Sequence, residues 1–358
     1  MRGTPHQFAT LDGLRGVAAL AVMSQHFWHE LGTVPLPHNY LAVDFFFVLS
    51  GFVLAHAYED RLLDGMTPTQ FLRLRLIRLY PLYLIGMLIG IATATAVGSL
   101  DWPKEPKTCL SVLSTLLFLP DPSARSDAYP LNAPAWSLFF ELTVNAAYAI
   151  GIRKLSNRFL IIIAFLSLAV LAACYGNLKI GSSWANFIGG FPRVCFGFFV
   201  GVLTYRIWST ATWRPSLPQW TAPGLAIALL LILDVSSFDL VAVLVFPFIV
   251  YCGASREPSL RTRAIFLWLG GISYALYITH VPLLQAARFA AGYFSQAPLR
   301  DAAPWAGLAI GAGAVILAAV LSSIDPALRR ILMAGKKGAV VTAIRPPKPT
   351  SLTLKLGH

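Results

Sequence analysis

Long apolar runs are the feature of this 358-residue chain that most constrains its fold. Stretches of about 15–22 residues recur throughout the sequence, close to the roughly 20 residues that a helix needs to cross a bilayer. The composition agrees, since 56% of residues are hydrophobic, only 12% are charged, and the mean hydropathy is +0.66. The runs are continuous and do not alternate with polar residues, which excludes a membrane β-barrel. The sequence therefore predicts an all-α integral membrane protein.

About ten transmembrane helices are predicted from these runs. The expected spans cover residues 10–29, 40–57, 79–98, 135–152, 159–175, 185–206, 221–234, 239–253, 264–286 and 303–324. A further apolar piece, residues 109–120, is short for a crossing, and we expect it to be re-entrant or interfacial. If it does not cross, most of the 28 Lys and Arg residues fall on one side. The positive-inside rule then makes that side cytoplasmic and places both termini there.

The net charge of +12 reflects the flanks of the predicted spans and the C-terminal tail. We therefore expect membrane lipids as partners and no nucleic acid. Residues 1–330 form the predicted membrane domain, and residues 331–358 a basic, disordered cytoplasmic tail suited to anionic headgroups. The four cysteines lie in apolar segments without CxxC spacing, so we expect buried thiols, no disulfide framework and no metal site.

Arg15 and His26 lie within the first predicted span, where an ionisable side chain marks a functional site by default. Their separation is about 20° more than three helical turns, so both lie on one stripe, about 16 Å apart. A structural interpretation is also open, because Arg15 could reach the bilayer surface and His26 could bond a carbonyl. The shared stripe favours a site that extends across much of the bilayer.

Several ionisable side chains in different spans are predicted at one depth. They are His26, Asp44, Glu141, Arg193 and His280. Charges at this depth must face each other or water, because lipid gives them no partner. Arg193 therefore either pairs with Asp44 or Glu141, or takes part in the chemistry.

A basic helix precedes the third span. Thr67 predicts its N-cap, with Pro68 at the first helical position and Gln70 three residues after the cap. Arg75 and Arg78 are i, i+3 neighbours on this helix. Two guanidinium groups at the membrane surface suit the phosphates of a ligand, and they equally suit those of lipids.

Five segments together resemble the acyltransferase-3 family of membrane acyltransferases. In chain order they are LDGLRGVAALAVMSQHF, VDFFFVLSGF, FLRLRLIRLYPLY, NAPAWSLFFE and GGISYALYITHVPLL, from residue 11 to residue 284. The resemblance implies transfer of an acyl group, usually acetyl, from cytoplasmic acyl-CoA to a hydroxyl of an extracytoplasmic glycan or glycolipid. Surface polysaccharides and lipopolysaccharide are typical acceptors, and a bacterial inner membrane is the implied location. No permanently bound cofactor is expected, and we expect the form without a fused esterase-like domain.

Residues of this chain fill the motif positions of the family: Arg15, His26, Arg75, Arg78, Trp136, Ser137 and Glu141. By resemblance, the expected acyl-CoA-binding residues are Arg15, Arg75 and Arg78. His26 is the expected general base or transient acyl carrier, with Glu141 or Asp44 orienting its imidazole. The expected supporting residues are Arg193, Trp136, Ser137, Ser273, Tyr277 and His280, of which the last three share one helical face.

Two other classes remain open from the sequence. A transporter or flippase of a polar lipid or glycan precursor would also carry charges within its spans, but it predicts repeated halves that we do not find. A non-catalytic partner of glycan export predicts that the charged residues can be neutralised without loss of function.

Overall fold

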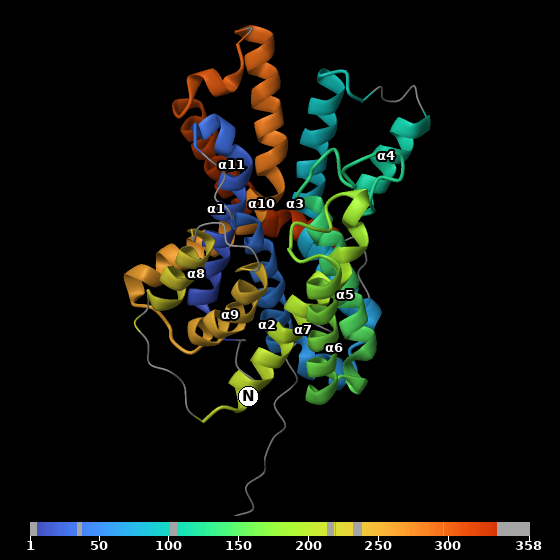
Figure 1. Ribbon diagram of the computed structural model, residues 1–358, viewed down its shortest axis with the longest axis vertical. Coiled ribbons are helices and arrows are strands. Elements are labelled where there is room, and N and C mark those ends of the chain that lie inside the picture. The colour runs from blue at the N-terminus through green and yellow to red at the C-terminus, as the bar shows by residue number, and fades with distance from the viewer. Residues whose placement is uncertain are drawn as a thin grey trace, which may run out of the picture.

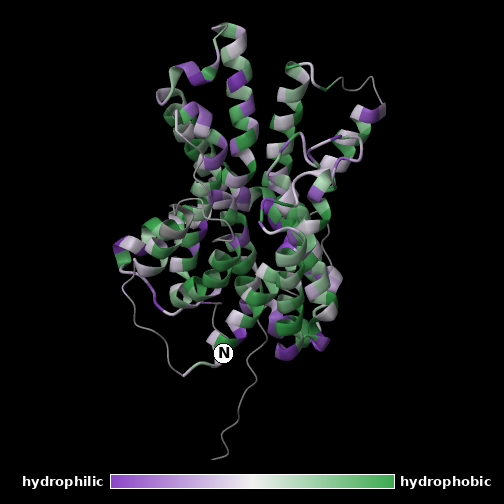
Figure 2. Ribbon diagram, viewed as in Figure 1, coloured by the Kyte–Doolittle hydropathy of each residue, from purple (hydrophilic) through white to green (hydrophobic). Residues whose placement is uncertain are grey.

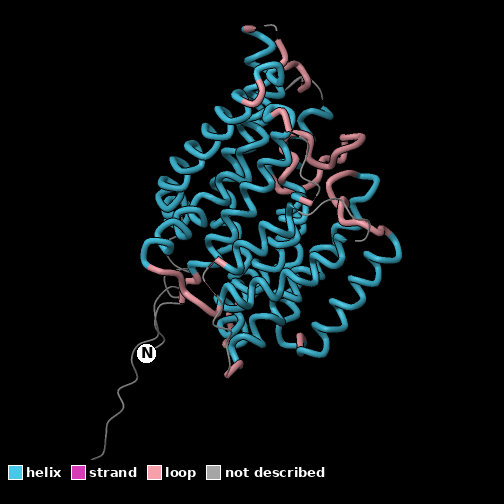
Figure 3. The backbone as a smooth tube through the Cα atoms, turned by 60° about the vertical axis from the view of Figure 1, so that its left-hand side comes forward, coloured by secondary structure: helices cyan, strands magenta, loops and turns pink. Residues whose placement is uncertain are grey.

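The computed structural model describes residues 6–33, 38–100, 106–212, 218, 220–231, 238–295 and 297–334. Its α-helices are α1 (Ala9–Leu31), α2 (Ala42–Leu63), α3 (Pro68–Ala96), α4 (Pro106–Leu116), α5 (Ala135–Gly151), α6 (Asn157–Cys174), α7 (Gly190–Thr210), α8 (Thr221–Leu231), α9 (Phe238–Ala254), α10 (Leu260–Phe294) and α11 (Trp305–Ala334). Short 3₁₀ helices are η1 (Asn39–Leu41), η2 (Ile152–Lys154), η3 (Trp184–Gly189) and η4 (Leu299–Ala302). Within these ranges no strand forms, which confirms the all-α class (Figure 3).

Each of the ten predicted spans falls on a helix of the bundle (Figure 1). Seven helices are long and apolar enough to cross a membrane by length and composition: α2 with η1, α3, α5 with η2, α6, α7 with η3, α10 and α11. The other three expected spans correspond to α1, α8 and α9. Of the expected span 221–234, residues 232–234 are outside the described part. The integral membrane class is supported, and the count of ten stays a prediction.

Apolar side chains cover the outside of the bundle. Phe165 and Ile162 on α6 are 69% and 51% exposed, whereas most of α2 and α7 is buried. Hydrophobic residues extend along the helices in Figure 2, and hydrophilic ones concentrate towards their ends. In water such a surface would be costly, so it is the surface that lipid covers.

Helices α2 and α7 pack with their backbones almost in contact. A Cβ atom at Gly51 would lie 1.9 Å from the carbonyl oxygen of Phe198, and one at Gly201 would lie 2.1 Å from that of Val48. Small residues allow this approach, which is typical of helix pairs in membranes. The consequence is that polar groups on α2 and α7 come within hydrogen-bonding distance.

The predicted start of the basic helix is confirmed. The side-chain oxygen of Thr67 accepts a hydrogen bond from the Gln70 backbone N–H, and the Gln70 side chain accepts one from the Thr67 backbone N–H. This basic helix and the third expected span form one helix, α3, which continues through Pro81. Helix α4 covers part of the short piece 109–120, and its length of roughly 16 Å is about half of a hydrocarbon core.

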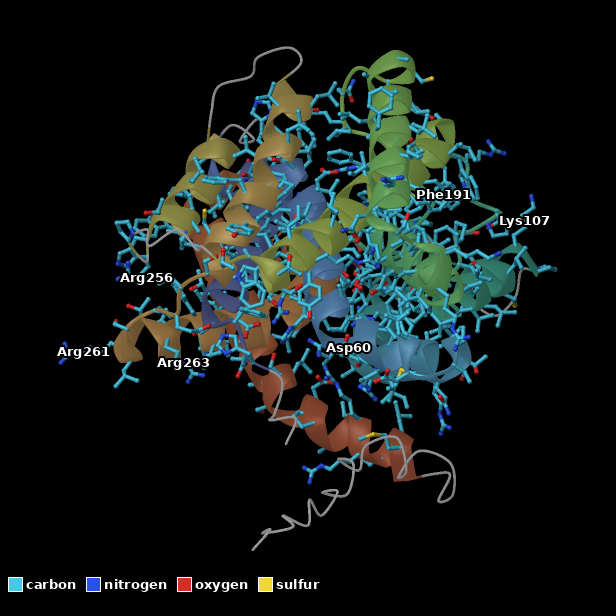
Figure 4. The ribbon with its side chains drawn as sticks, turned by 90° about the horizontal axis from the view of Figure 1, so that it is seen from below. Asp60, Lys107, Phe191, Arg256, Arg261 and Arg263 are labelled. Carbon is cyan, nitrogen blue, oxygen red and sulfur yellow. The ribbon has the colours of Figure 1, made fainter. Side chains whose placement is uncertain are left out.

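The remaining expectations concern the tail, the thiols and the basic flanks. Helix α11 extends to Ala334, and the rest of the expected tail lies outside the described residues. The expectation of four buried thiols is wrong, because Cys252 is buried but Cys174 is exposed. Cys174 is exposed because it lies on α6, at the outside of the bundle. In the view from below, Arg256, Arg261 and Arg263 project from one edge of the molecule (Figure 4).

Candidate active site

The site is built on the contact between α1 and α10. A Cβ atom at Gly16 would lie 2.5 Å from the Cβ of Leu269, and one at Gly270 would lie 2.5 Å from the Cβ of Asp12. The two helices therefore approach closely at the LDGLRG segment. The predicted polar stripe of α1 faces α10 along the length of this contact, because Arg15 bonds Ser273 and His26 contacts His280.

His26 and His280 form a pair of imidazoles. The Nε2 atom of His280 lies 3.1 Å from Nδ1 of His26, and the ring centroids are 5.0 Å apart. His26 Nδ1 is also 2.9 Å from the carbonyl oxygen of Val22, and His280 Nδ1 is 3.0 Å from that of Leu276. Each ring is thus held against the carbonyl four residues earlier on its own helix.

These contacts assign the protons of the neutral pair. A carbonyl oxygen is only an acceptor, so both Nδ1 atoms must carry hydrogen. His280 Nε2 then has a lone pair that accepts from His26 Nδ1–H, which is shared with the Val22 carbonyl. The arrangement leaves Nε2 of His26 unprotonated, which is the form that a general base requires.

Arg15 is tied to both helices of this contact. Its Nη2 donates to Asp12 Oδ1 at 2.6 Å and to the Gly270 carbonyl at 3.2 Å, and its Nε donates to Ser273 Oγ at 3.1 Å. The side chain remains 27% exposed and faces a cavity. Sequence reasoning did not select Asp12, although it lies in the segment that carries the family resemblance.

The expectation that Glu141 or Asp44 orients His26 is wrong. Glu141 Oε1 accepts from Arg75 Nη2 at 2.7 Å and from Ser50 Oγ at 2.9 Å, so it joins α5 to α3 and α2. Arg75 is buried in this ion pair and is not a surface guanidinium, contrary to expectation. The histidine partner of His26 takes the place that the carboxylates were expected to fill.

Asp44 and Arg193 form a separate buried pair between α2 and α7. Arg193 donates from Nε to Asp44 Oδ1 at 2.8 Å and from Nη2 to Oδ2 at 2.7 Å. It also donates to the carbonyls of Ile180 and Tyr40, and its guanidinium lies 5.0 Å from the centre of the Trp136 ring. Of the partners left open for Arg193, Asp44 and Glu141, the structure shows Asp44, and these bonds occupy the guanidinium internally.

Ser137 lies at the start of α5 beside α10. Its Oγ is 2.7 Å from the Tyr277 hydroxyl, and both groups are within 3.2 Å of the Pro134 carbonyl oxygen. The Tyr277 and His280 rings have centroids 6.2 Å apart. Ser137 therefore joins α5 to α10 next to the histidine pair.

A cavity of about 550 Å³ leads from the start of α1 towards Tyr277, and we call it the Arg78 cavity. Its polar lining includes Arg15, Arg75, Arg78, Ser137, Glu141 and Tyr277. Asp325 and Arg329, an ion pair on α11, also line it. Arg78 differs from the other arginines of this cavity because it is exposed and has no hydrogen bond or ion pair to any described residue.

A second cavity, of about 940 Å³, lies between α3, α4, the C-terminal half of α10 and the loop before α5. We call it the Tyr293 cavity. Figure 1 shows the upper parts of α3 and α10, which both contribute to this lining, with α4 beside α3. On α10 the lining of the Arg78 cavity ends at Tyr277 and that of the Tyr293 cavity begins at Gln285, about 12 Å further along the helix. His280 lies between these two positions.

The wall between the two cavities is well packed. Asn132 Nδ2 donates to the Ile278 carbonyl at 2.8 Å, and a Cβ atom at Gly86 would lie 2.6 Å from the same oxygen. On α3 the two linings are separated by the segment from Leu82 to Thr93, about 16 Å long. The histidine pair therefore lies within a wall that is thinner than a hydrocarbon core of about 30 Å.

Sequence reasoning missed the ion pair that extends the α1–α10 contact beyond the histidines. Arg288 Nε donates to Glu30 Oε1 at 2.7 Å, and Glu30 is 3% exposed. Glu30 follows His26 by four residues and Arg288 follows His280 by eight. The intramembrane charge rule that selected Arg15 also applies to residues close to a span end, so it was the available signal.

The lining of the Tyr293 cavity predicts whether the two flanks of the short piece 109–120 lie on the same side of the membrane. Lys107 and Arg125, on either side of the short piece 109–120, line this one cavity, so both flanks belong on one side of the membrane. In a background without the native cysteines, Lys107→Cys and Arg125→Cys should react with a membrane-impermeant maleimide from the same side. Labelling from opposite sides would contradict this topology and make the short piece a crossing.

Comparison with known proteins identifies the family. A model of the acyltransferase-3 family, described as an acyltransferase domain, matches residues 8–324. Protein 2 in the picA locus of Rhizobium radiobacter is 40% identical over 183 residues, which are 47% of this chain and 95% of that protein. No solved structure matches.

Two more relatives cover most of the chain. The exopolysaccharide production protein ExoZ of Rhizobium meliloti (strain 1021) is 28% identical over 297 residues, which are 78% of this chain and 83% of that protein. The acyltransferase MdmB of Streptomyces mycarofaciens is 28% identical over 388 aligned positions, which cover 94% of this chain and 95% of that protein. With the family match extending from α1 into α11, around the histidine pair and both cavities, this chain belongs to the acyltransferase-3 family.

Proposed function

We propose that this membrane acyltransferase moves an acetyl group from acetyl-CoA to a hydroxyl of a glycan, with His26 as the general base. The observation that carries the proposal is the position of the His26–His280 pair between two cavities about 12 Å apart along α10. Two substrates that approach from opposite ends need such an arrangement. The name of one relative, an exopolysaccharide production protein, supports a glycan as the acceptor.

The Arg78 cavity is the proposed donor site. Its arginines outnumber its carboxylates, since Asp12, Glu141 and Asp325 pair with Arg15, Arg75 and Arg329. Arg78 makes no hydrogen bond or ion pair with a residue that the structure describes. A free guanidinium suits a phosphate, which it binds with two parallel hydrogen bonds. The pantetheine arm of acetyl-CoA would then extend past Arg15 towards Tyr277. We place the mouth of this cavity on the cytoplasmic side, where acetyl-CoA is made.

The proposed chemical step uses the unprotonated Nε2 of His26. It removes the proton of the acceptor hydroxyl while that oxygen attacks the thioester carbonyl, and the C–S bond then breaks. The CoA thiolate leaves and takes the proton from the imidazolium, so the balance is one ester and one free thiol. His280 Nε2 and the Val22 carbonyl hold Nδ1–H in the charged intermediate state, as an orienting group does in other base-catalysed acyl transfers.

Acetyl-CoA turnover in lipid nanodiscs tests the donor site. Arg78→Ala should raise KM for acetyl-CoA by about 10- to 100-fold, the effect of losing one hydrogen bond to a charged group, with a smaller change in kcat. Release of free CoA is the measurement. Arg73→Ala is the matched control, because Arg73 lies on the same helix outside both cavities.

A second donor, S-acetylpantetheine, tests whether Arg78 binds the phosphates of acetyl-CoA or those of lipids. It lacks the nucleotide phosphates, so Arg78→Ala and the wild type should turn it over with the same KM. An unchanged KM for acetyl-CoA in Arg78→Ala would assign this arginine to lipid headgroups and contradict the donor site.

A further inference from the structure

The Tyr293 cavity has the chemistry of a carbohydrate site. Its polar and aromatic lining includes Lys107, Arg125, Asp127, Gln285, Phe289 and Tyr293. At about 940 Å³ it is near the upper end of ordinary small-ligand pockets. Such a volume accommodates one or more sugar rings of a longer chain.

Several polar side chains of this cavity have no partner among the residues that the structure describes. Arg125, Asp127 and Gln285 make no side-chain hydrogen bond or ion pair to any residue in the described ranges. Asp121 contrasts with them, because its carboxylate accepts from Ser111 and Ser123 and thereby shapes the loop. The free groups include donors and acceptors, and a sugar hydroxyl can satisfy either kind.

An aromatic surface borders these groups. Phe289 and Tyr293 are i, i+4 neighbours on α10, with ring centroids 6.1 Å apart and an angle of 35° between the rings. Tyr293 is 71% exposed, so its ring is open to a ligand. The apolar C–H face of a pyranose ring packs on such a surface while its hydroxyls point to polar neighbours, and tyrosine combines both properties.

The cavity lies beyond the histidine pair along α10, and neither histidine is part of its lining. Gln285 follows His280 by five residues, and the Arg288–Glu30 ion pair fixes this part of α10 to α1 one turn beyond His26. A sugar bound against Gln285 and Phe289 would therefore lie at the acceptor side of the histidine pair. The assignment of the bound sugar as acceptor rests on the proposed function, whereas the binding of a sugar in the cavity does not.

We propose that the Tyr293 cavity binds a pyranose unit of a glycan chain, with the Phe289–Tyr293 surface under the ring and Asp127 and Gln285 at its hydroxyls. The bound unit is the acyl acceptor. The chain extends out of the cavity past the exposed ring of Tyr293.

Calorimetric titration of the full chain in nanodiscs tests this site without turnover. The His26→Ala protein is titrated with β-linked gluco- and galacto-oligosaccharides of three to eight sugars, in the absence of acetyl-CoA. We expect saturable binding of at least one oligosaccharide, and a Kd at least tenfold higher when Tyr293→Ala is added. Tyr293→Phe keeps the ring and should hold the Kd within about threefold.

The matched control is Trp305→Ala, which removes another exposed aromatic side chain that lines neither cavity. It should leave the Kd unchanged, and thermal unfolding of each variant checks its fold. Binding of no oligosaccharide, or equal loss in Tyr293→Ala and Trp305→Ala, would overturn the site and make Tyr293 a bilayer anchor. Tyr293-dependent binding by a protein whose wild type releases no CoA would keep the site and reject the proposed reaction.

Discussion

Replacing His26 with alanine is expected to lower kcat for acyl transfer by about 10²- to 10⁴-fold, the usual contribution of a positioned general base. The variant removes the imidazole whose Nδ1 lies 3.1 Å from His280 Nε2 and 2.9 Å from the Val22 carbonyl. Release of CoA from acetyl-CoA by purified protein in nanodiscs, with a crude glycan acceptor, is the measurement. KM for acetyl-CoA should change little, because the Arg78 cavity does not include His26.

His29→Ala is the matched control for this prediction. His29 lies three residues later on α1, is exposed and stacks on Trp28, so its removal should leave kcat unchanged. A His26→Ala protein that keeps kcat within tenfold of the wild type would remove His26 from the mechanism. Incubating the wild type with acetyl-labelled acetyl-CoA, without acceptor, distinguishes a general base from an acyl carrier. Only an acyl carrier would retain the labelled acetyl group on His26.

We expect His280 to affect catalysis through its contact with His26, and two substitutions of His280 test this. His280→Ala should lower kcat with KM for acetyl-CoA unchanged, because an acceptor for His26 Nδ1–H is lost. His280→Asn supplies an amide oxygen that can accept the same hydrogen bond, so it should restore part of kcat. Equal loss of kcat in both variants would give His280 a packing role only.

The fold could be predicted from the sequence where local physics decides. Continuous apolar runs gave the all-α membrane class, and the Thr67–Gln70 capping box has the predicted geometry. The spacing of Arg15 and His26 predicted one stripe, and both residues do contact α10. Pro81 does not separate the basic helix from the third span, because α3 continues through it, and propensity alone could not show this.

The partners of the charged residues could not be predicted, because they depend on which helices pack together. The predicted spans place Glu141, Asp44 and His26 at a similar depth in the membrane. Which helices neighbour α2 and α10, however, depends on the close backbone contacts at Gly51 and Gly270. Glu141 therefore meets Arg75, and Asp44 meets Arg193. Pairing rules select opposite charges, and only the helix packing decides among several candidates.

The Asp44–Arg193 pair carries the largest expected effect on stability. Arg193 is 3% exposed, and without Asp44 its charge would remain buried against two carbonyls and Trp136. Asp44→Ala should therefore lower the free energy of unfolding by about 3–5 kcal/mol, the range for breaking a buried ion pair on one side. Unfolding by SDS titration in mixed micelles is the measurement.

Asp60→Ala is the control, because Asp60 lies on the same helix, is exposed and appears on the end of the molecule shown in Figure 4. It should change the free energy of unfolding by no more than about 0.5 kcal/mol. The double variant Asp44→Leu/Arg193→Met removes both charges and should be more stable than Asp44→Ala, since replacing a buried pair is far less costly than breaking it. Two outcomes would contradict this prediction: a decrease in the free energy of unfolding of less than about 1 kcal/mol in Asp44→Ala, or a double variant less stable than Asp44→Ala. Either would show that an unpaired, buried Arg193 does not destabilise the bundle.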